Sequence, residues 1–125
     1  MSISLGEHSK LTVHPSEREK IRKFYRDVLE CPVTKESEAV DIFQIGNNFY
    51  LGVVYDDSAL NMENCLKAIW LELRTDHPEK LKQKILRFGI GELEYWDKEH
   101  FYFQAPGGQV FRLADSAEGM SKRQK

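Results

Sequence analysis

The 125-residue sequence has no long hydrophobic run, because none of its apolar stretches approaches the roughly 20 residues that cross a bilayer. Its first ten residues, MSISLGEHSK, have neither the basic segment nor the apolar core of a signal peptide. The net charge is only −2, with the two signs well mixed, so the electrostatic footprint of a nucleic-acid-binding protein is absent. These absences predict a cytoplasmic protein that binds neither nucleic acid nor membranes.

Cysteine is also scarce. Cys31 and Cys65 are the only two, and their spacing matches no metal-binding or redox motif. In a chain without an export signal we expect both to be reduced structural thiols. The sequence also has no Ser-His-Asp set, Cys-His pair or phosphate-binding loop, so hydrolase and nucleotide chemistry receive no support.

What is present is the composition of one globular domain, with 41% apolar and 30% charged residues. The clearest local pattern is a β-hairpin over residues 101–113, FYFQAPGGQVFRL, in which side chains alternate on both sides of a Pro-Gly-Gly turn. Tyr102, Gln104 and Arg112 fall on the face opposite the apolar side chains. An arginine in the middle of a strand needs either water or a partner.

The rest of the chain follows one order of elements twice. The first half is predicted to contain a strand over residues 7–14, a helix over 15–30, and strands over 33–35, 40–45 and 49–55. The second half is predicted to contain a strand over 67–74, a helix from 76 to 88, and strands over 93–96, 101–104 and 109–114. This order divides the single domain into a first module (5–56), a linker (57–65), a second module (66–115) and a frayed tail (116–125).

Two motifs carry a resemblance to a known family. FYRDVL at residues 24–29 and APGGQVFRL at 105–113, in this order of elements, resemble the vicinal oxygen chelate superfamily of glyoxalase I, bleomycin-resistance proteins and extradiol dioxygenases. The resemblance implies an α+β fold in which two βαβββ modules curl their sheets into a cup, with helices outside. A ferredoxin-like regulatory domain fits less well, because it leaves the linker and the second set of three strands unexplained.

The resemblance also implies where a metal would bind. In metal-dependent members the cup holds a divalent ion, whose ligands come from the first and last strands of each module. The matching positions in this sequence are His8, Gly52 or Val53, Ala68 and Arg112. Of these, only His8 keeps a side chain that can ligate a metal.

Arg112 is the most informative of these substitutions. A guanidinium is always protonated and has no lone pair to donate. At an effective dielectric constant of about 20, it would repel a divalent cation about 5 Å away by about 7 kcal/mol. The sequence therefore predicts no cofactor and no metal at the usual site. The alternative is a displaced divalent-metal site that uses His8 and Glu72.

Without a metal, we expect the cup to bind a small organic molecule, either anionic or aromatic. The candidate ligand-binding residues are Arg112, Tyr102, Trp70, Gln104 and Lys10. Bleomycin-resistance proteins are the metal-free precedent in the family, and their dimers imply a homodimer here. The alternative is an enzyme, a lyase, isomerase or dioxygenase with a displaced metal, in which Tyr102 and Glu72 are the candidate catalytic groups.

Each candidate residue also has an ordinary structural interpretation. Arg112 is either a ligand anchor or the partner of Glu72 in a structural ion pair, and the sequence leaves both open. Trp70 and Tyr102 fit a core or a dimer interface as well as a ligand-stacking wall. His8, close to the N-terminus, fits an exposed histidine.

Overall fold

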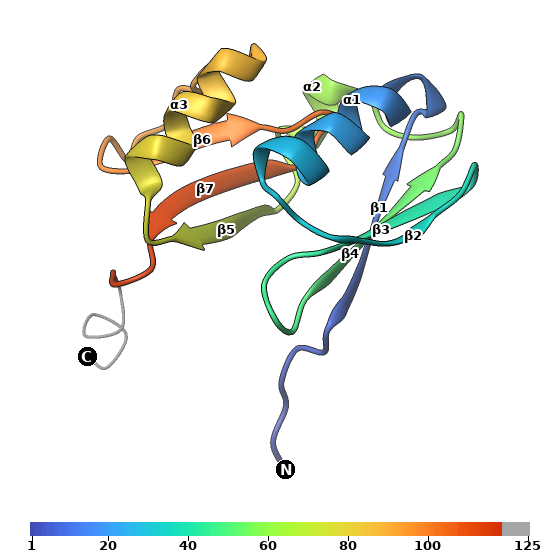
Figure 1. The fold of residues 1–125 in the computed structure, drawn as a ribbon, viewed down its shortest axis with the longest axis horizontal. Coiled ribbons are helices and arrows are strands. Elements are labelled where there is room, and N and C mark those ends of the chain that lie inside the picture. Colours follow the sequence, from blue (N-terminus) through green and yellow to red (C-terminus); the bar gives the residue numbers. More distant parts are fainter. Residues whose placement is uncertain (119–125) are drawn as a thin grey trace. The chain divides into compact units, whose positions relative to one another are not determined.

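The computed structural model describes residues 1–118 and divides into two compact units, Met1–Asn61 and Met62–Lys125. The first unit carries a four-stranded sheet and the second a three-stranded sheet, and each sheet is accompanied by helices (Figure 1). The predicted α+β class is confirmed. In the part of the chain that is described, no helix has the length and apolar character needed to cross a membrane.

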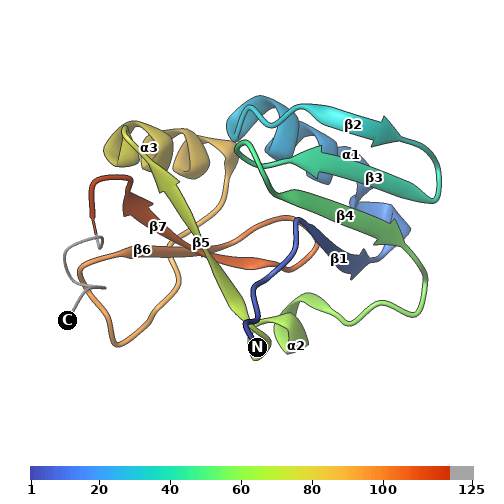
Figure 2. The ribbon, with the colours of Figure 1, turned by 90° about the horizontal axis from the view of Figure 1, so that it is seen from below.

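The first unit is built from seven elements. They are β1 (His8–Val13), η1 (Pro15–Glu17), α1 (Arg18–Arg22), η2 (Lys23–Val28), β2 (Val33–Glu36), β3 (Val40–Gln44) and β4 (Tyr50–Tyr55). The strands lie in the order β1-β4-β3-β2, as Figure 2 shows. The β1–β4 pair is parallel and the other two pairs are antiparallel. The helical segment between β1 and β2 makes that parallel pairing possible, because parallel neighbours need a long crossover connection.

The helix predicted over residues 15–30 forms as one uninterrupted helical segment over residues 15–28, but its hydrogen-bond pattern changes along its length. It starts as a 3₁₀ turn (η1), continues as α1 and ends as a π-helix (η2). The wider turn is marked at its end by a hydrogen bond from the backbone N–H of Leu29 to the carbonyl of Phe24, at 3.0 Å. The apolar stripe still faces inward, because Ile21, Phe24 and Tyr25 are fully buried.

A buried carboxylate joins this helical segment to the sheet of the first unit. Asp41 on β3 has no exposed surface. It accepts hydrogen bonds from Arg22 Nε at 2.8 Å and Nη2 at 3.1 Å, from the Tyr55 hydroxyl at 2.7 Å and from the Ser37 backbone N–H at 3.2 Å. The charge is therefore both paired and hydrogen-bonded, which is the condition for keeping an ion in a protein interior.

Over residues 62–118, the described part of the second unit, the topology is repeated with one strand fewer. Its elements are α2 (Met62–Cys65), β5 (Trp70–Thr75), α3 (Pro78–Phe88), β6 (Phe101–Gln104) and β7 (Val110–Asp115). The strand order is β5-β7-β6, with β5 parallel to β7 and β6 antiparallel to it. β5, β7 and β6 thus correspond to β1, β4 and β3. α3 lies against β5 and β7 and covers one face of this sheet (Figure 1).

The missing strand is the one predicted over residues 93–96, and that prediction is wrong. Leu93 donates one backbone hydrogen bond to the carbonyl of Tyr102, at 2.8 Å, but no ladder follows it. The Asp97 side chain accepts the backbone N–H of Glu99 at 2.9 Å. Such a local side-chain cap offers the backbone an alternative to strand pairing, and it turns the chain here.

The β6–β7 hairpin matches its prediction closely. β6 has the predicted bounds, and the Ala105 N–H donates to the Gln109 carbonyl at 2.8 Å across the turn. Gly107 and Gly108 have φ angles of 88° and 120°, a region that favours glycine. The register pairs Phe103 with buried Phe111 on the face that packs under α3, and it places Tyr102, Gln104 and Arg112 on the opposite face.

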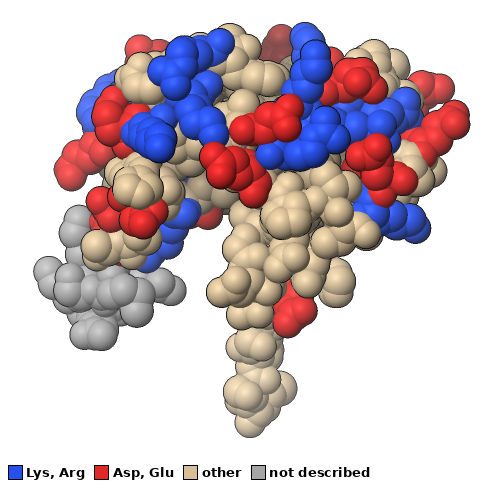
Figure 3. Space-filling model, in the orientation of Figure 1, with Lys and Arg blue, Asp and Glu red and all other residues tan. Residues whose placement is uncertain are grey.

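The predicted linker and tail are partly structured. α2 lies inside the predicted linker. Ser116 donates a backbone hydrogen bond to the carbonyl of Thr75 at 2.8 Å, so residues 116–118 extend the contacts of the sheet. The rest of the predicted frayed tail, 119–125, lies outside the described residues. Acidic and basic side chains are intermingled over the helices on the face shown in Figure 3, in keeping with the small net charge.

Candidate functional site

Arg112 lies at the centre of the second unit's sheet. The register places it between Glu72 on β5 and Tyr102 on β6, all on one face. Its Nε and Nη2 donate to the same carboxylate oxygen of Glu72, at 3.0 and 2.7 Å. The guanidinium carbon also lies 4.9 Å from the centre of the Trp70 ring, within the range of a cation–π contact. The ion pair between Arg112 and Glu72, one of the two alternatives left open by the sequence, is therefore formed.

Glu72 is shared between two arginines. Its second oxygen accepts a hydrogen bond from Arg74 Nε at 3.0 Å. Burial alone would raise the pKa of Glu72, but the hydrogen bonds from Arg74 and Arg112 outweigh burial and hold this pKa below its usual value. Glu72 is therefore a carboxylate with both oxygens engaged, which does not suit it to act as a proton donor.

Asp97 is a second carboxylate beside Arg112. Its Oδ2 accepts a hydrogen bond from the Tyr102 hydroxyl at 3.0 Å and lies 3.7 Å from Arg112 Nη1. The backbone N–H of Glu99, and then His100 and Tyr102, lower the pKa of Asp97 to about 2, against the opposing effect of burial. The two carboxylates on either side of Arg112 thus stay ionised, and they balance the charge of the arginines.

His100 lies between two carboxylates. Its Nδ1 is 2.7 Å from Asp97 Oδ2, and its Nε2 is 2.5 Å from Glu118 Oε1. Because an ionised carboxylate only accepts hydrogen bonds, both ring nitrogens need a hydrogen, which makes the ring an imidazolium. Burial and the nearby Arg112 charge lower the pKa of His100, but the hydrogen bonds to Glu118 and Asp97 raise it more, so it lies above its usual value.

This geometry predicts a pH-dependent contribution to stability. Because the pKa of His100 is higher in the folded protein than the value of about 6.5 in an unfolded chain, its stabilisation is complete below that pH. The stabilisation is then lost as the pH rises through the raised pKa. Urea unfolding of the native protein and of His100→Gln should therefore differ most near pH 5–6, and the difference should shrink at alkaline pH.

Exposed His77, in the same unit, supplies the control for this measurement. His77→Gln is expected to change the free energy of unfolding little at any pH. A difference between His100→Gln and the native protein that does not vary with pH would contradict the imidazolium assignment.

An aromatic wall adjoins these charges on the same face. The Tyr102 ring contacts Trp70 edge-on at 5.7 Å and Tyr95 at 4.4 Å between ring centres. Trp70 Nε1 donates to the Tyr95 hydroxyl at 3.4 Å. Tyr102 is buried, whereas Trp70 and Tyr95 keep partial exposure and Trp96 is 82% exposed. The accessible part of the wall is therefore Trp70 with Tyr95 and Trp96.

The other predicted site residues lie elsewhere. Gln104 Nε2 donates to the backbone carbonyls of Met62 at 2.7 Å and Gly108 at 3.1 Å, so this side chain braces the hairpin turn. Lys10 and His8 belong to the first unit, where both are exposed. Lys10 Nζ donates to the Thr12 hydroxyl at 3.1 Å, and the His8 ring stacks on Tyr50 at 5.3 Å.

The residues of the second unit do not fit the metal that the family resemblance implies. The guanidinium of Arg112 cannot ligate a cation, and both oxygens of Glu72 are already held by arginines. Within residues 1–118, no group of three or more His, Cys, Asp or Glu side chains is placed to hold a metal ion.

Sequence reasoning missed three polar or aromatic members of this face, Asp97, His100 and Tyr95. For two of them the sequence carries a partial signal, which does not fix their contacts. His100 has the same strand parity as Tyr102, and Asp97 precedes it by three residues, so an aspartate before a strand-flanking histidine was the available signal. Tyr95 had been assigned to the strand that does not form.

The relatives of this chain were found by comparing structures and not by comparing sequences. No family model matches the sequence, and no curated protein matches it. A mutant of the fosfomycin resistance protein FosX from Listeria monocytogenes, solved with Mn(II) and 1S,2S-dihydroxypropylphosphonic acid, superposes with a TM-score of 0.74 at 15% identity. The match covers 100% of this chain and 98% of that one.

Two further solved structures have the same fold. TnmS3, an antibiotic binding protein from a Streptomyces species, has a TM-score of 0.63 at 18% identity, covering 92% of this chain and 98% of that chain. Lactoylglutathione lyase from Agrobacterium tumefaciens has a TM-score of 0.64 at 16% identity, covering 93% and 96%. The chain therefore has the glyoxalase-like fold of these proteins, and the fold implied by the resemblance found in the sequence is confirmed.

Proposed function

We propose that this glyoxalase-like chain binds a small aromatic molecule, neutral or anionic, on the sheet face that carries Arg112, without the usual divalent metal. The observation that carries the proposal is the ionised Arg112–Glu72 pair at a position where the family resemblance implies a metal ligand. TnmS3, an antibiotic binding protein with this fold, supports a binding role over a catalytic one.

Each side chain of this face has a specific part in the proposal. Trp70 offers the ring surface on which an aromatic ligand stacks, edge-on to Tyr102. Arg112 Nη1 lies 3.7 Å from Asp97 Oδ2, farther than Nε and Nη2 lie from Glu72, so it is the donor that we assign to a ligand carboxylate or carbonyl. Gln104 and Lys10 remain further ligand-binding candidates, and Gln104 would first have to leave its two carbonyl partners.

Thermal-shift titration tests the arginine anchor. We expect stabilisation by small aromatic carboxylates and aromatic amides that does not require added divalent metal. Arg112→Ala should weaken binding of the carboxylates about tenfold or more, because a hydrogen bond to a charged group contributes about 1.5–3 kcal/mol. Arg74→Ala removes the other arginine on Glu72 and should leave the affinity nearly unchanged. If Arg112→Ala folds and keeps the full ligand-induced stabilisation, the arginine-anchor proposal fails.

The second candidate function is a metal-dependent lyase, isomerase or dioxygenase with a displaced site. It is favoured by one finding, the Mn(II) with which the Listeria FosX mutant is complexed. In that case Tyr102 and Glu72 would be the catalytic groups, and Glu72 would first have to leave Arg74 and Arg112. Calorimetric titration with Mn²⁺ separates the two candidates. The metal-dependent enzyme should bind Mn²⁺ stoichiometrically and should need it for stabilisation by a ligand, whereas the metal-free binding protein should do neither.

A homodimer in the cytoplasm completes the proposal. The dimer is implied by the bleomycin-resistance members of the superfamily rather than by a contact within this chain. Light scattering coupled to size-exclusion chromatography would reveal it, and a mass near the 14.6 kDa of one chain would exclude it.

A further inference from the structure

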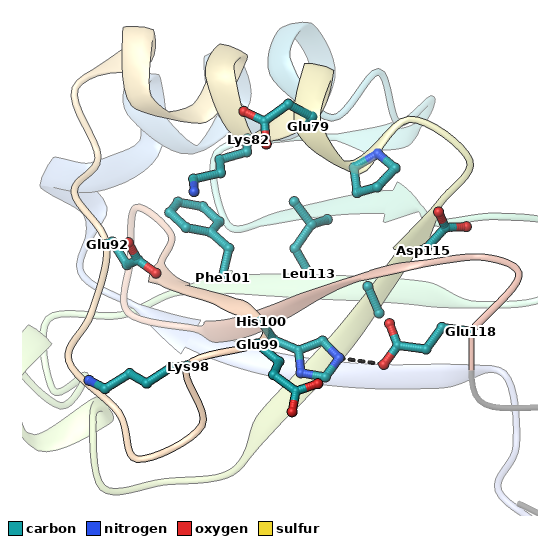
Figure 4. Close-up of a pocket in the computed structure, with 12 residues that line it drawn as sticks. Glu79, Lys82, Glu92, Lys98, Glu99, His100, Phe101, Leu113, Asp115 and Glu118 are labelled. Atoms are coloured by element: carbon teal, nitrogen blue, oxygen red, sulfur yellow. Dashed lines mark hydrogen bonds and ion pairs between the residues drawn. The ribbon is translucent and has the colours of Figure 1, made fainter. Parts of the chain in front are cut away.

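A separate candidate site lies on the opposite, helix-covered side of the sheet in the second unit. It is a pocket of about 320 Å³ between the first half of α3, the loop before β6, and the ends of β6 and β7 (Figure 4). Phe101 and Leu113 alternate with Tyr102 and Arg112, so they point away from the aromatic wall and into this pocket. Small-molecule sites have volumes of roughly 300 Å³ and more, so this pocket lies at the lower end of their range.

The inner surface of the pocket is apolar and already receives a cation. Phe101 and Leu113 are almost fully buried. The ammonium of Lys82, from α3, lies 5.3 Å from the centre of the Phe101 ring (Figure 4). An ammonium at this distance from an aromatic face is attracted by the ring's negative π surface. The Lys82 ammonium therefore occupies the position over the Phe101 ring that a ligand cation would take.

The rim of the pocket is predominantly acidic. Five carboxylates line it, against two lysines and one histidine: Glu79, Glu92, Glu99, Asp115 and Glu118, against Lys82, Lys98 and His100. Two of the three cations are already engaged, because Lys98 pairs with Glu94 at 3.1 Å and His100 is held by Asp97 and Glu118. Among the lining residues that the structure describes, the Lys82 ammonium is therefore the one that competes for the space above the ring.

We propose that this pocket binds a small organic ammonium ion with an aromatic or alkyl body. The ligand ammonium would lie over Phe101 in place of the Lys82 ammonium, which swings out toward water on its flexible stem. The apolar body would rest on Leu113, and the carboxylates of Glu92 and Glu99 would attract the charge from the rim. The pocket lies on the other side of the sheet from Arg112 and meets that face at His100, and it does not depend on the function proposed for that face.

Heteronuclear NMR titration of the full chain with phenethylammonium tests this site. We expect saturable shifts of the backbone amides of Phe101, Leu113 and Lys82. Two matched probes, 2-phenylethanol and phenylacetate, have the same ring and carry no charge or the opposite charge. If 2-phenylethanol shifts the amides of Phe101, Leu113 and Lys82 with the same affinity as phenethylammonium, or if phenethylammonium causes no saturable shifts of these amides, the proposal is overturned.

Phenethylammonium binding to the Lys82→Met variant distinguishes an ammonium site from a pocket that is only apolar. The substitution removes the competing ammonium and should tighten phenethylammonium binding about twofold to fivefold, the equivalent of an exposed cation–π contact. Lys80→Met, on the exposed part of the same helix, should leave binding unchanged. Glu92→Gln should weaken binding without disturbing the buried inner surface. If Lys82→Met weakens binding, the ammonium is not held over Phe101 and the assignment is wrong.

Discussion

Asp41→Ala is expected to lower the free energy of unfolding by about 3–5 kcal/mol, because breaking a buried ion pair removes the main partner of the charge that remains, and the half-exposed Glu36, 3.7 Å from Arg22 Nη1, compensates that charge incompletely. The charge left behind belongs to Arg22, whose side chain is only 17% exposed and donates two hydrogen bonds to Asp41. The Tyr55 hydroxyl and the Ser37 N–H lose their acceptor as well. A loss of this size is a large fraction of the 5–15 kcal/mol that typically stabilises a domain.

Asp27→Ala is the matched control for this prediction. Asp27 also lies beside an arginine, Arg26, at 3.4 Å, but both side chains are about half exposed. An exposed pair contributes about 0.2–1 kcal/mol, so this variant should unfold close to the native protein in urea. If the two aspartate variants lose similar amounts, the buried network around Asp41 does not carry the stability assigned to it.

The position of the tryptophans makes the same experiment more informative. Trp70 and Trp96 both lie in the second unit, whereas Asp41 lies in the first. Circular dichroism follows the secondary structure of the whole chain, and tryptophan fluorescence follows only the second unit. Asp41→Ala should shift both transitions together if the units unfold cooperatively. A fluorescence transition that stays at the native midpoint would show that the units unfold separately.

The strands that could be predicted from sequence are those specified by local patterns. The hairpin of β6 and β7 is an example, since alternation fixes the faces and Pro106-Gly107-Gly108 fixes the turn. The strand predicted over residues 93–96 also alternates, yet it does not form. There the outcome depends on the Asp97 side chain, which binds the local backbone and Tyr102, and alternation carries no information on that competition.

The helix over residues 15–30 gives a second lesson. Its apolar spacing correctly identified the buried side, including Ile21 and Phe24. The π-helical end could not be read from that spacing, because a π segment differs from an α segment by one residue in its hydrogen-bond pattern. Spacing over two turns is compatible with either winding.

The candidate site was predictable where its members share strands and not where they come from loops. Arg112 and Glu72 could be placed on one face by alternation, so their ion pair was among the foreseen alternatives. Asp97 and His100 reach the same face from an irregular segment. Their contacts with Tyr102 and Glu118 depend on a three-dimensional path that no periodicity describes.

Gly108→Ala is the second large expected effect, and it tests the turn on which the hairpin depends. We expect a loss of about 2–5 kcal/mol, which combines about 1–2 kcal/mol for a side chain at positive φ with about 1–3 kcal/mol for overpacking. The φ of Gly108 is 120°, and a methyl group there would meet Cys65 Sγ at 2.7 Å and Cys65 Cβ at 2.9 Å. The neighbouring cysteine is itself buried, so it has little room to move away.

Gly89→Ala separates the two contributions. Gly89, in the left-handed position after α3, has a similar φ of 111°, but a methyl group there would meet nothing within 4 Å. It should therefore lose only the backbone part, about 1–2 kcal/mol, in the same urea titration followed by tryptophan fluorescence. Cys65→Ala should make the Gly108→Ala substitution less costly, because removing Sγ relieves the closer contact and leaves the Cβ contact. Equal losses in Gly108→Ala and Gly89→Ala would mean that α2 yields to the added methyl group, and that the close approach of Cys65 to the turn contributes nothing to the stability of the hairpin.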